Sequence, residues 1–364
     1  MKEEANMEES AEKATEKPKS YYFTFCGTGG TLFGIQIVNL FLILVTFGIY
    51  YFWGKARVRK YIWSQIDICG DRLSYQGTGK ETFFGWLKAM LIFGIPFLFF
   101  QNAPQLLGAP FPVTIICIIM SFILFLIFLP IAMIGMRKYR LSRTALRGIR
   151  FSFRGRWWEF ARIFYGGLGL MAITLGFYRP YWDMRINAYI MQKTFFGSKR
   201  FDFDGKGSDL FGRYVLSFIP VVFAIVLTFL TIISHIATPL SRSTMLLIPL
   251  LMFIFVISFF ISQFIYGYFS KKYTWNHMTF DTVRFQTTIT FGGYFWLYIS
   301  NLLLLMVTLG FGLPWVKVRT LRYVMDHLTL NGHLDMAAIV QDAQLSTATG
   351  EEIGGFLELD MDLA

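Results

Sequence analysis

The residues best suited to chemistry are polar side chains that recur at fixed spacing along the chain. Three blocks of the form Thr-x-Gly share apolar neighbours, and their threonines and glycines are Thr46, Gly48, Thr174, Gly176, Thr308 and Gly310. Seven residues before the first and third threonines stand Asn39 and Asn301, whereas the second block has Gly167 there. Hydroxyls, amides and the carbonyls of a broken helix can coordinate a solute inside a membrane. These residues are therefore candidates for a permeation pathway, and the alternative is that they hydrogen-bond one helix to another.

A basic stretch follows each block. An arginine comes eleven residues after each threonine and a tyrosine fifteen residues after it. The cations that we select from these stretches are Lys55, Arg57, Arg59, Arg185 and Arg319. In the first stretch Val58, Ile62 and Ile66 share one helical face opposite several cations, which predicts an amphipathic helix at the membrane interface. The open alternative is a plain cytosolic extension of the preceding helix.

Other familiar chemistry is not indicated. The glycine turns at 27–30 and 77–79 lack the strand–loop–helix setting and the spaced lysine of a phosphate loop, so they favour tight turns. The cluster from Asp326 and His327 to His333 and Asp335 has ligand types without a recognisable metal spacing. No nucleophile–base pair can be identified, and the apolar runs contain no aspartate or glutamate. We therefore predict no catalytic residue, cofactor or metal site, and we do not expect an enzyme.

Composition defines the class of protein that positions these residues. Of 364 residues, 55% are hydrophobic and only 16% are charged, and the mean hydropathy is +0.50. A soluble globular chain carries about 25% charged residues, so a polytopic membrane protein is the leading class. The three cysteines, Cys26, Cys69 and Cys117, are far apart, which favours isolated thiols in a reducing compartment.

Charge is unevenly distributed along the chain. Residues 1–20 carry a net charge of −2 and residues 336–364 a net charge of −6, so residues 21–335 carry +19. The first segment predicts a disordered cytosolic arm and the last an acidic cytosolic tail. The bases lie between apolar runs, so attraction to anionic headgroups explains them better than nucleic-acid binding.

Seven apolar stretches lie at about 32–53, 83–101, 112–136, 160–178, 214–236, 244–269 and 291–313. Seven simple crossings would put either 137–157 or 179–212 outside the membrane, although both loops are rich in lysine and arginine, and the positive-inside rule opposes this. We therefore expect four crossing helices, with the three Thr-x-Gly segments broken or re-entrant. Seven crossings that obey the charge rule weakly remain the alternative.

A second signature precedes several apolar runs. Aromatic and polar residues alternate and end in glycine at 23–29, 73–79, 151–155 and 201–207, a pattern typical of a short strand and tight turn. We accordingly predict an all-α polytopic membrane protein with short cytosolic β-hairpin elements. Three internal repeats, at about 21–148, 149–282 and 283–335, would form one membrane domain.

The first block also carries a resemblance to a known family. The segment 48–59, Gly-Ile-Tyr-Tyr-Phe-Trp-Gly-Lys-Ala-Arg-Val-Arg, followed by 70–79, Gly-Asp-Arg-Leu-Ser-Tyr-Gln-Gly-Thr-Gly, resembles the YjgN-like group of bacterial inner-membrane proteins. The likeness spans roughly residues 21–335 and implies a multi-pass protein of the bacterial inner membrane. It implies no activity, because the group is functionally uncharacterised. The second and third blocks depart from the first, with Arg179-Pro180 and Leu313-Pro314 where it has Tyr51-Phe52.

Two functional hypotheses follow. Transport or permeation of a small solute comes first, because repeats with broken segments are a common transporter plan. The alternative is a non-catalytic protein that organises the membrane or binds anionic lipid, which the basic stretches favour. The expected partners are the lipid bilayer and anionic headgroups, without nucleic acid, and a homo-oligomer is compatible with the sequence.

Overall fold

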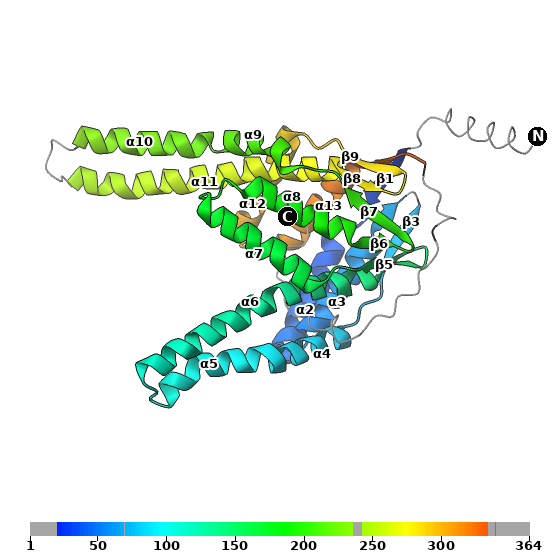
Figure 1. Ribbon diagram of the computed structural model, residues 1–364. Coiled ribbons are helices and arrows are strands. Elements are labelled where there is room, and N and C mark those ends of the chain that lie inside the picture. Colours follow the sequence, from blue (N-terminus) through cyan, green and yellow to red (C-terminus); the bar gives the residue numbers. More distant parts are fainter. Residues whose placement is uncertain (1–19, 69, 236–241, 334–338, 340–364) are drawn as a thin grey trace, which may run out of the picture.

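Ten short strands form a closed antiparallel barrel at one end of the molecule (Figure 1). The computed structural model describes residues 20–68, 70–235, 242–333 and 339. The strands are β1 (Ser20–Phe25), β2 (Ile66–Ile68), β3 (Asp71–Tyr75), β4 (Thr144–Leu146), β5 (Ile149–Phe153), β6 (Thr194–Phe196), β7 (Lys199–Phe203), β8 (Met278–Phe280), β9 (Val283–Thr287) and β10 (Leu328–Asn331). Each strand pairs with its neighbours in sequence, and β10 pairs with β1 to close the ring.

The prediction of an all-α fold with three repeats is wrong. The chain forms five successive strand–helix–helix–strand units, at 20–68, 71–146, 149–196, 199–280 and 283–331. Because every unit gives two strands to the barrel, the short β elements are one shared structure and not isolated hairpins. Two-residue turns link several units, as at Arg147 and Gly148 between β4 and β5, where φ is +50° and +80°. Such φ values match the type I′ turns that suit the twist of β-hairpins.

Each unit places one helical hairpin on the same side of the barrel (Figure 1). Units one, three and five have short hairpins: α2 (Gly29–Val45) with α3 (Tyr51–Ser64), α7 (Trp157–Ile173) with α8 (Arg179–Gln192), and α12 (Phe291–Val307) with α13 (Leu313–Asp326). Units two and four have long hairpins: α4 (Gly79–Ala89), η1 (Met90–Gly94) and α5 (Ile95–Leu106) with α6 (Phe111–Ser142), and α9 (Gly207–Ser217) and α10 (Ile219–His235) with α11 (Arg242–Asn276). The two long hairpins reach farthest from the barrel and diverge (Figure 1).

Among the described residues, four helices are long and apolar enough to cross a membrane: Gly79–Leu106, Phe111–Ser142, Gly207–Ser234 and Leu247–Asn276. The first helices of the short hairpins have only 17 residues. Exposed large apolar side chains run from Ile37 to Val45 on α2 and from Phe84 to Leu107 in the first long hairpin. At about 1.5 Å per residue these stretches are about 12 and 35 Å long, against about 30 Å of hydrocarbon. The exposed apolar stretch of α2 is therefore less than half as long as the hydrocarbon is thick, whereas that of the first long hairpin is long enough to span it.

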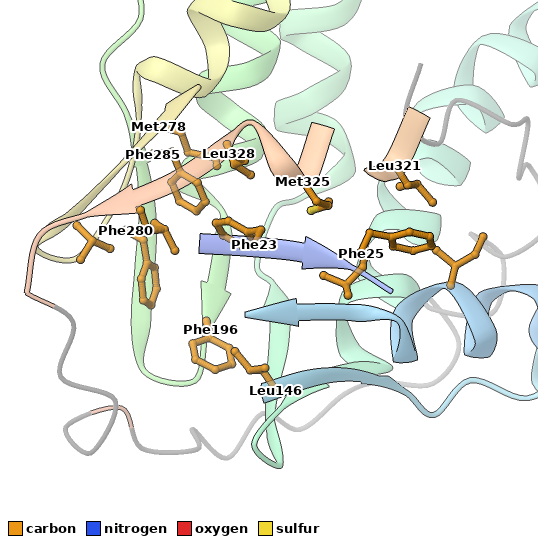
Figure 2. Close-up of a cluster of buried hydrophobic side chains, with 14 of the residues drawn as sticks. Phe23, Phe25, Leu146, Phe196, Met278, Phe280, Phe285, Leu321, Met325 and Leu328 are labelled. Carbon is orange, nitrogen blue, oxygen red and sulfur yellow. The ribbon is translucent and has the colours of Figure 1, made fainter. Parts of the chain in front are cut away.

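The barrel interior is filled with side chains. Phe23, Phe196, Phe280 and Phe285 come from four different strands and converge in one cluster (Figure 2). Buried residues of α3 and α13, including Leu321, join this cluster at the helical end. Alternate residues of each longer strand point inward, which explains the aromatic–polar alternation of the sequence.

Four of the five first strands end with the same local contact. An aromatic residue packs its ring on a glycine two positions later, where a Cβ atom would collide with the ring: the pairs are Phe25–Gly27, Tyr75–Gly77, Phe153–Gly155 and Phe203–Gly205. In unit five the sizes are exchanged, with Thr287 as the small residue and buried Ile289 as the large one. The contact therefore explains why aromatic-x-Gly recurs, and the exchange explains why the fifth strand lacks it.

Two further contacts connect the hairpins and units. Three glycines at helix starts lie against an aromatic residue of the short hairpin that precedes them around the barrel, again with no room for a Cβ atom. The pairs are Gly29 with Trp315, Gly79 with Trp53 and Gly207 with Tyr181. A tyrosine near the end of a second helix also binds the start of the first helix in its own unit. Tyr61 Oη accepts a hydrogen bond from Thr28 N at 2.8 Å and donates one to Thr28 O at 3.2 Å. Tyr189 makes the same pair of bonds with Arg156, and burial raises its pKa to about 12.

The predicted arm (1–20) and tail (336–364) lie outside the described residues, apart from Ser20 and Ile339. Ile339 is buried in the barrel cluster. Cys26 and Cys117 are free thiols, and Cys69 lies outside the described residues.

Candidate functional site

The predicted Thr-x-Gly breaks are ordered turns between the two helices of each short hairpin. Thr46 Oγ1 donates a hydrogen bond to Leu42 O at 2.7 Å and accepts one from Tyr50 N at 2.9 Å. Thr174 and Thr308 make the corresponding pairs of bonds. Each hydroxyl thus satisfies backbone groups on both sides of its turn, which is a structural role.

The residue after each threonine forms the apex of the hairpin. Phe47, Leu175 and Leu309 have φ near +50° and are 97%, 88% and 87% exposed. The glycines that follow have φ near +90°, a conformation that L side chains rarely adopt, and they are Gly48, Gly176 and Gly310. A large apolar side chain held in this conformation at a fully exposed apex fits lipid better than water.

Asn39 and Asn301 are buried on the inner face of their helices. Asn39 Nδ2 donates to Gly54 O at 3.1 Å, and Asn301 Nδ2 donates to Thr320 Oγ1 at 3.2 Å. Both Oδ1 atoms are buried with no hydrogen-bond partner in the described part of the chain. In unit one the large residue of the contact, Asn39, is on the first helix and the small one, Gly54, is on the second. In unit three the small residue, Gly167, is on the first helix and the ring of Trp182 on the second helix covers it.

The predicted basic residues are spread over the second helices. Arg57 and Arg185 lie over the rings of Tyr50 and Tyr178, at 5.6 and 5.7 Å. Arg319 Nη2 donates to Ser300 Oγ at 2.8 Å. These contacts tie three of the cations to their own hairpins.

The stretch at 51–64 is the returning helix α3 of the first hairpin. Ile62 and the half-buried Val58 belong to the barrel cluster, and Ile66 belongs to β2 rather than to the same helical face. The apolar face of this helix therefore packs against protein and not against the membrane interface. Contact of its cations with lipid headgroups stays a prediction.

Two adjoining cavities lie between the first and last hairpins, whose helices α2 and α13 are in contact. The first, of about 340 Å³, is lined by α2, α3 and the start of α13, and Asn39 and Gly310 are on its wall. The second, of about 400 Å³, is lined by α3, α12 and α13, with Asn301 and Arg59 on its wall. Lys55 and Lys317 line both cavities.

The cavities combine apolar walls with cations. Leu40 and Ile43 line the first, Leu302 and Leu305 line the second, and no acidic side chain is among the described lining residues of either. Such a lining suits a molecule with an apolar part and an anionic part. Of the residues selected from sequence, Asn39, Asn301, Gly310, Lys55 and Arg59 meet here, whereas Thr46, Gly48, Thr174, Gly176, Thr308, Arg57, Arg185 and Arg319 do not line the cavities.

Sequence reasoning missed a polar cluster between α8 and α11. Tyr266 Oη donates to Asp183 Oδ2 at 2.6 Å, and Arg179 donates to Gln263. Asp183 lies five residues beyond the apolar run at 160–178 and four residues after Arg179. That spacing, together with a lone glutamine inside the run at 244–269, was the available signal.

The histidine cluster lies at the barrel end. His327 Nδ1 is 2.8 Å from Tyr323 O, and Asp335 lies outside the described residues. In the described ranges no group of three or more histidine, cysteine or acidic residues is arranged to hold a metal ion.

Comparison with known proteins finds a family and relatives whose sequences match this chain. The family model described as "Bacterial protein of unknown function (DUF898)" matches residues 20–356. Inner membrane protein YjgN of Salmonella typhimurium strain LT2 is 22% identical over 371 aligned residues, covering 89% of this chain and 91% of that protein. Inner membrane protein YjgN of Escherichia coli O157:H7 is 35% identical over 144 residues, covering 38% of this chain and 33% of that protein. The alignment with the protein of the same name from strain K12 also spans 33% of its length. No solved structure matches the chain.

Proposed function

Because the chain belongs to the DUF898 family of bacterial proteins of unknown function, we propose a function from its cavities: it binds an anionic phospholipid between its first and last helical hairpins. The chain is a multi-pass bacterial inner-membrane protein, since its relatives carry that name and four of its helices are long enough to cross. The lipid bilayer is therefore its surroundings, and the question is what occupies the cavities.

The observation that carries the proposal is the position of Lys55 and Lys317. Both lie one helical turn after the start of the second helix of a short hairpin, close to the lipid-facing apex. Two lysines on the wall shared by both cavities create a local positive charge beside apolar side chains. Basic side chains near the membrane surface attract anionic lipid headgroups by about 1 kcal/mol each. The phosphate group of a lipid that enters from the bilayer would lie beside these lysines.

The distribution of cations along the molecule also favours an anionic lipid, because it predicts which leaflet the short hairpins enter. The barrel end carries turn and strand cations such as Arg147, Arg150 and Arg200. By the positive-inside rule this end faces the cytoplasm. The short hairpins then enter the cytoplasmic leaflet, whose anionic lipids attract basic segments.

The remaining polar groups favour a headgroup that can also donate hydrogen bonds. The Oδ1 atoms of Asn39 and Asn301 are acceptors that the described chain leaves unsatisfied. A buried acceptor without a partner costs about 1–3 kcal/mol. A phosphoglycerol headgroup offers both hydroxyl donors and an anionic phosphate, and its acyl chains would follow the apolar wall at Leu302 and Leu305.

Native mass spectrometry after extraction from vesicles of mixed phosphatidylglycerol and phosphatidylethanolamine tests this proposal. Wild type should retain phosphatidylglycerol selectively, and the double variant Lys55→Gln with Lys317→Gln should lose at least tenfold in retention. Lys60→Gln is the matched control, because Lys60 is an exposed cation of α3 that lines neither cavity. Equal retention by the double variant and the control would refute the proposal.

Permeation of a small solute is the second candidate. It is supported by the adjacency of the two cavities, which share four lining residues: Lys55, Val58, Leu313 and Lys317. Against a pore, the barrel interior at the helical end is filled by the cluster around Phe23 and Leu321. A flux screen in liposomes with Asn39→Ala and Asn301→Ala tests it: no flux in wild type, or flux that neither variant alters, removes this candidate.

A further inference from the structure

The polar cluster between α8 and α11 is unrelated to the lipid cavities and has a different composition. Tyr266 Oη donates to Asp183 Oδ2 at 2.6 Å, and Tyr266 is 2% exposed. Gln263 stands one turn earlier on α11 and accepts a hydrogen bond from Arg179. The cluster therefore joins a short hairpin of unit three to a long hairpin of unit four.

The ion pair in this cluster is loose. Arg179 Nε lies 3.8 Å from Asp183 Oδ2, and the guanidinium lies over the Tyr266 ring at 5.0 Å from its centre. Arg179 is thus shared among a carboxylate, an amide and a ring, and it does not form a bidentate pair with Asp183. A carboxylate held in this way depends on the Tyr266 hydroxyl for its short hydrogen bond.

The cluster lies at the depth of exposed apolar side chains. Arg179 follows the apex of its hairpin, at which Phe177 is exposed, and Phe259, Phe260 and Ile261 are exposed on α11 just before Gln263. An ionisable side chain at this depth is expensive when charged, and such residues commonly mark proton or ion pathways. Burial raises the pKa of Asp183, while Tyr266 and Arg179 act in the opposite direction.

We propose that Asp183 and Tyr266 form a proton-binding site between the third and fourth hairpins. In the ionised form Asp183 accepts the hydrogen bond of Tyr266 and faces Arg179. A proton taken up from water neutralises the carboxylate, makes it a donor and leaves Arg179 to Gln263 and the ring. Proton uptake therefore changes the contact between α8 and α11, with no other reactant required.

The groups that face this site from the surrounding elements are few. On α8 the charged neighbour is Arg179, on α11 the neutral Tyr266 hydroxyl faces the carboxylate, and on α9 Tyr214 stacks edgewise on Tyr266 and donates to Gly176 O at 3.0 Å. The other charged or titratable groups of α7, β7 and α9 are engaged elsewhere: Glu159 with Lys193, Arg162 with the Trp158 ring, Tyr165 with Leu126 O, Lys199 with Asp281, Arg200 with Asp202, Asp209 with the Tyr273 hydroxyl and Arg213 with the Phe269 ring. Proton binding at this point is consequently governed by three side chains.

Infrared difference spectroscopy of the full chain in lipid nanodiscs tests the proposal. Lowering the pH should produce a carboxylic-acid carbonyl band whose midpoint lies above that of an ordinary aspartate, and Asp183→Asn should abolish it. Asp202→Asn is the control, because Asp202 is half exposed at the barrel end, and the band should persist in it. A band that survives in Asp183→Asn, or a titration identical in both variants, would overturn the assignment.

Tyr266→Phe provides a second test that keeps the packing of the ring. Removing the hydroxyl takes a hydrogen bond away from the ionised carboxylate and disfavours the charged form. The midpoint of the band should move to higher pH. An unchanged midpoint would show that Tyr266 is not part of the site.

Discussion

Trp315 of the last helical hairpin lies directly over Gly29 at the start of the first, so closely that a Cβ atom at residue 29 would overlap the indole. This contact, together with the pairing of β1 with β10, joins the two ends of the chain. Gly29→Ala should therefore lower the free energy of unfolding by about 1–3 kcal/mol through overpacking. Chemical denaturation in lipid nanodiscs measures the change.

The adjacent Gly30 is a matched control for this prediction, because no atom lies within 4 Å of a Cβ placed there. Gly30→Ala should leave the stability unchanged or raise it by up to about 1 kcal/mol, since alanine is the better helix former. Similar effects of the two variants would show that the Trp315 contact does not restrain the ends of the chain.

Units one and three place the large residue of the same helix–helix contact on opposite helices, which predicts that substitutions at Gly167 and Trp182 affect stability in a coupled way. Asn39 covers Gly54 in unit one, whereas Trp182 covers Gly167 in unit three. Gly167→Asn alone should be destabilising because Trp182 occupies the space. Adding Trp182→Gly should recover part of the loss, with a coupling energy of about 0.5–3 kcal/mol in a double-mutant cycle.

Gly166→Ala serves as the control here, because Gly166 is the neighbour of Gly167 on α7 and nothing lies within 4 Å of its Cβ position. It should be neutral alone and additive with Trp182→Gly. Strict additivity of Gly167→Asn and Trp182→Gly would contradict the complementary packing.

Tyr61 should stabilise the first unit through its hydroxyl. Its Oη exchanges two hydrogen bonds with the backbone of Thr28, which lies 33 residues earlier. Tyr61→Phe keeps the ring and leaves the Thr28 amide and carbonyl without that partner, so we expect a loss of about 1–3 kcal/mol. Tyr22→Phe is the comparison, because Tyr22 is 62% exposed and its change should be small. Equal losses from the two variants would argue against a clamp.

The helices and some strands could be predicted from the sequence because their patterns are local. Long apolar runs indicated the four crossing helices, and aromatic alternation indicated β1, β3, β5 and β7. Strand β9 was missed because Thr287 and Ile289 replace the aromatic residue and the glycine. Most of the returning strands have only three residues, such as Ile66–Ile68, and are too short to show a period.

Closure of the barrel could not be predicted because it depends on pairing between the chain ends. Tyr21 pairs with Leu330, more than 300 residues away, and no local signal encodes that register. The candidate site was found only in part for the same reason. Asn39 and Asn301 could be selected from their repeated position, whereas Lys317 could not, because only the fold brings α13 beside α3 so that Lys317 and Lys55 line the same cavities.

Substitutions at Thr46 distinguish a role of the Thr-x-Gly turn in folding from a role in ligand binding. Its hydroxyl is the hydrogen-bond acceptor for Tyr50 N, and it lines neither cavity. Thr46→Val should therefore lower the free energy of unfolding by about 1–3 kcal/mol, because an unpaired amide in an apolar setting has no water to bind. Thr46→Ser keeps the hydroxyl and should lose less than half as much. Phosphatidylglycerol retention by native mass spectrometry should be the same in both variants and in wild type. A selective loss of lipid in Thr46→Val at unchanged stability would instead give the Thr-x-Gly turn a direct part in binding.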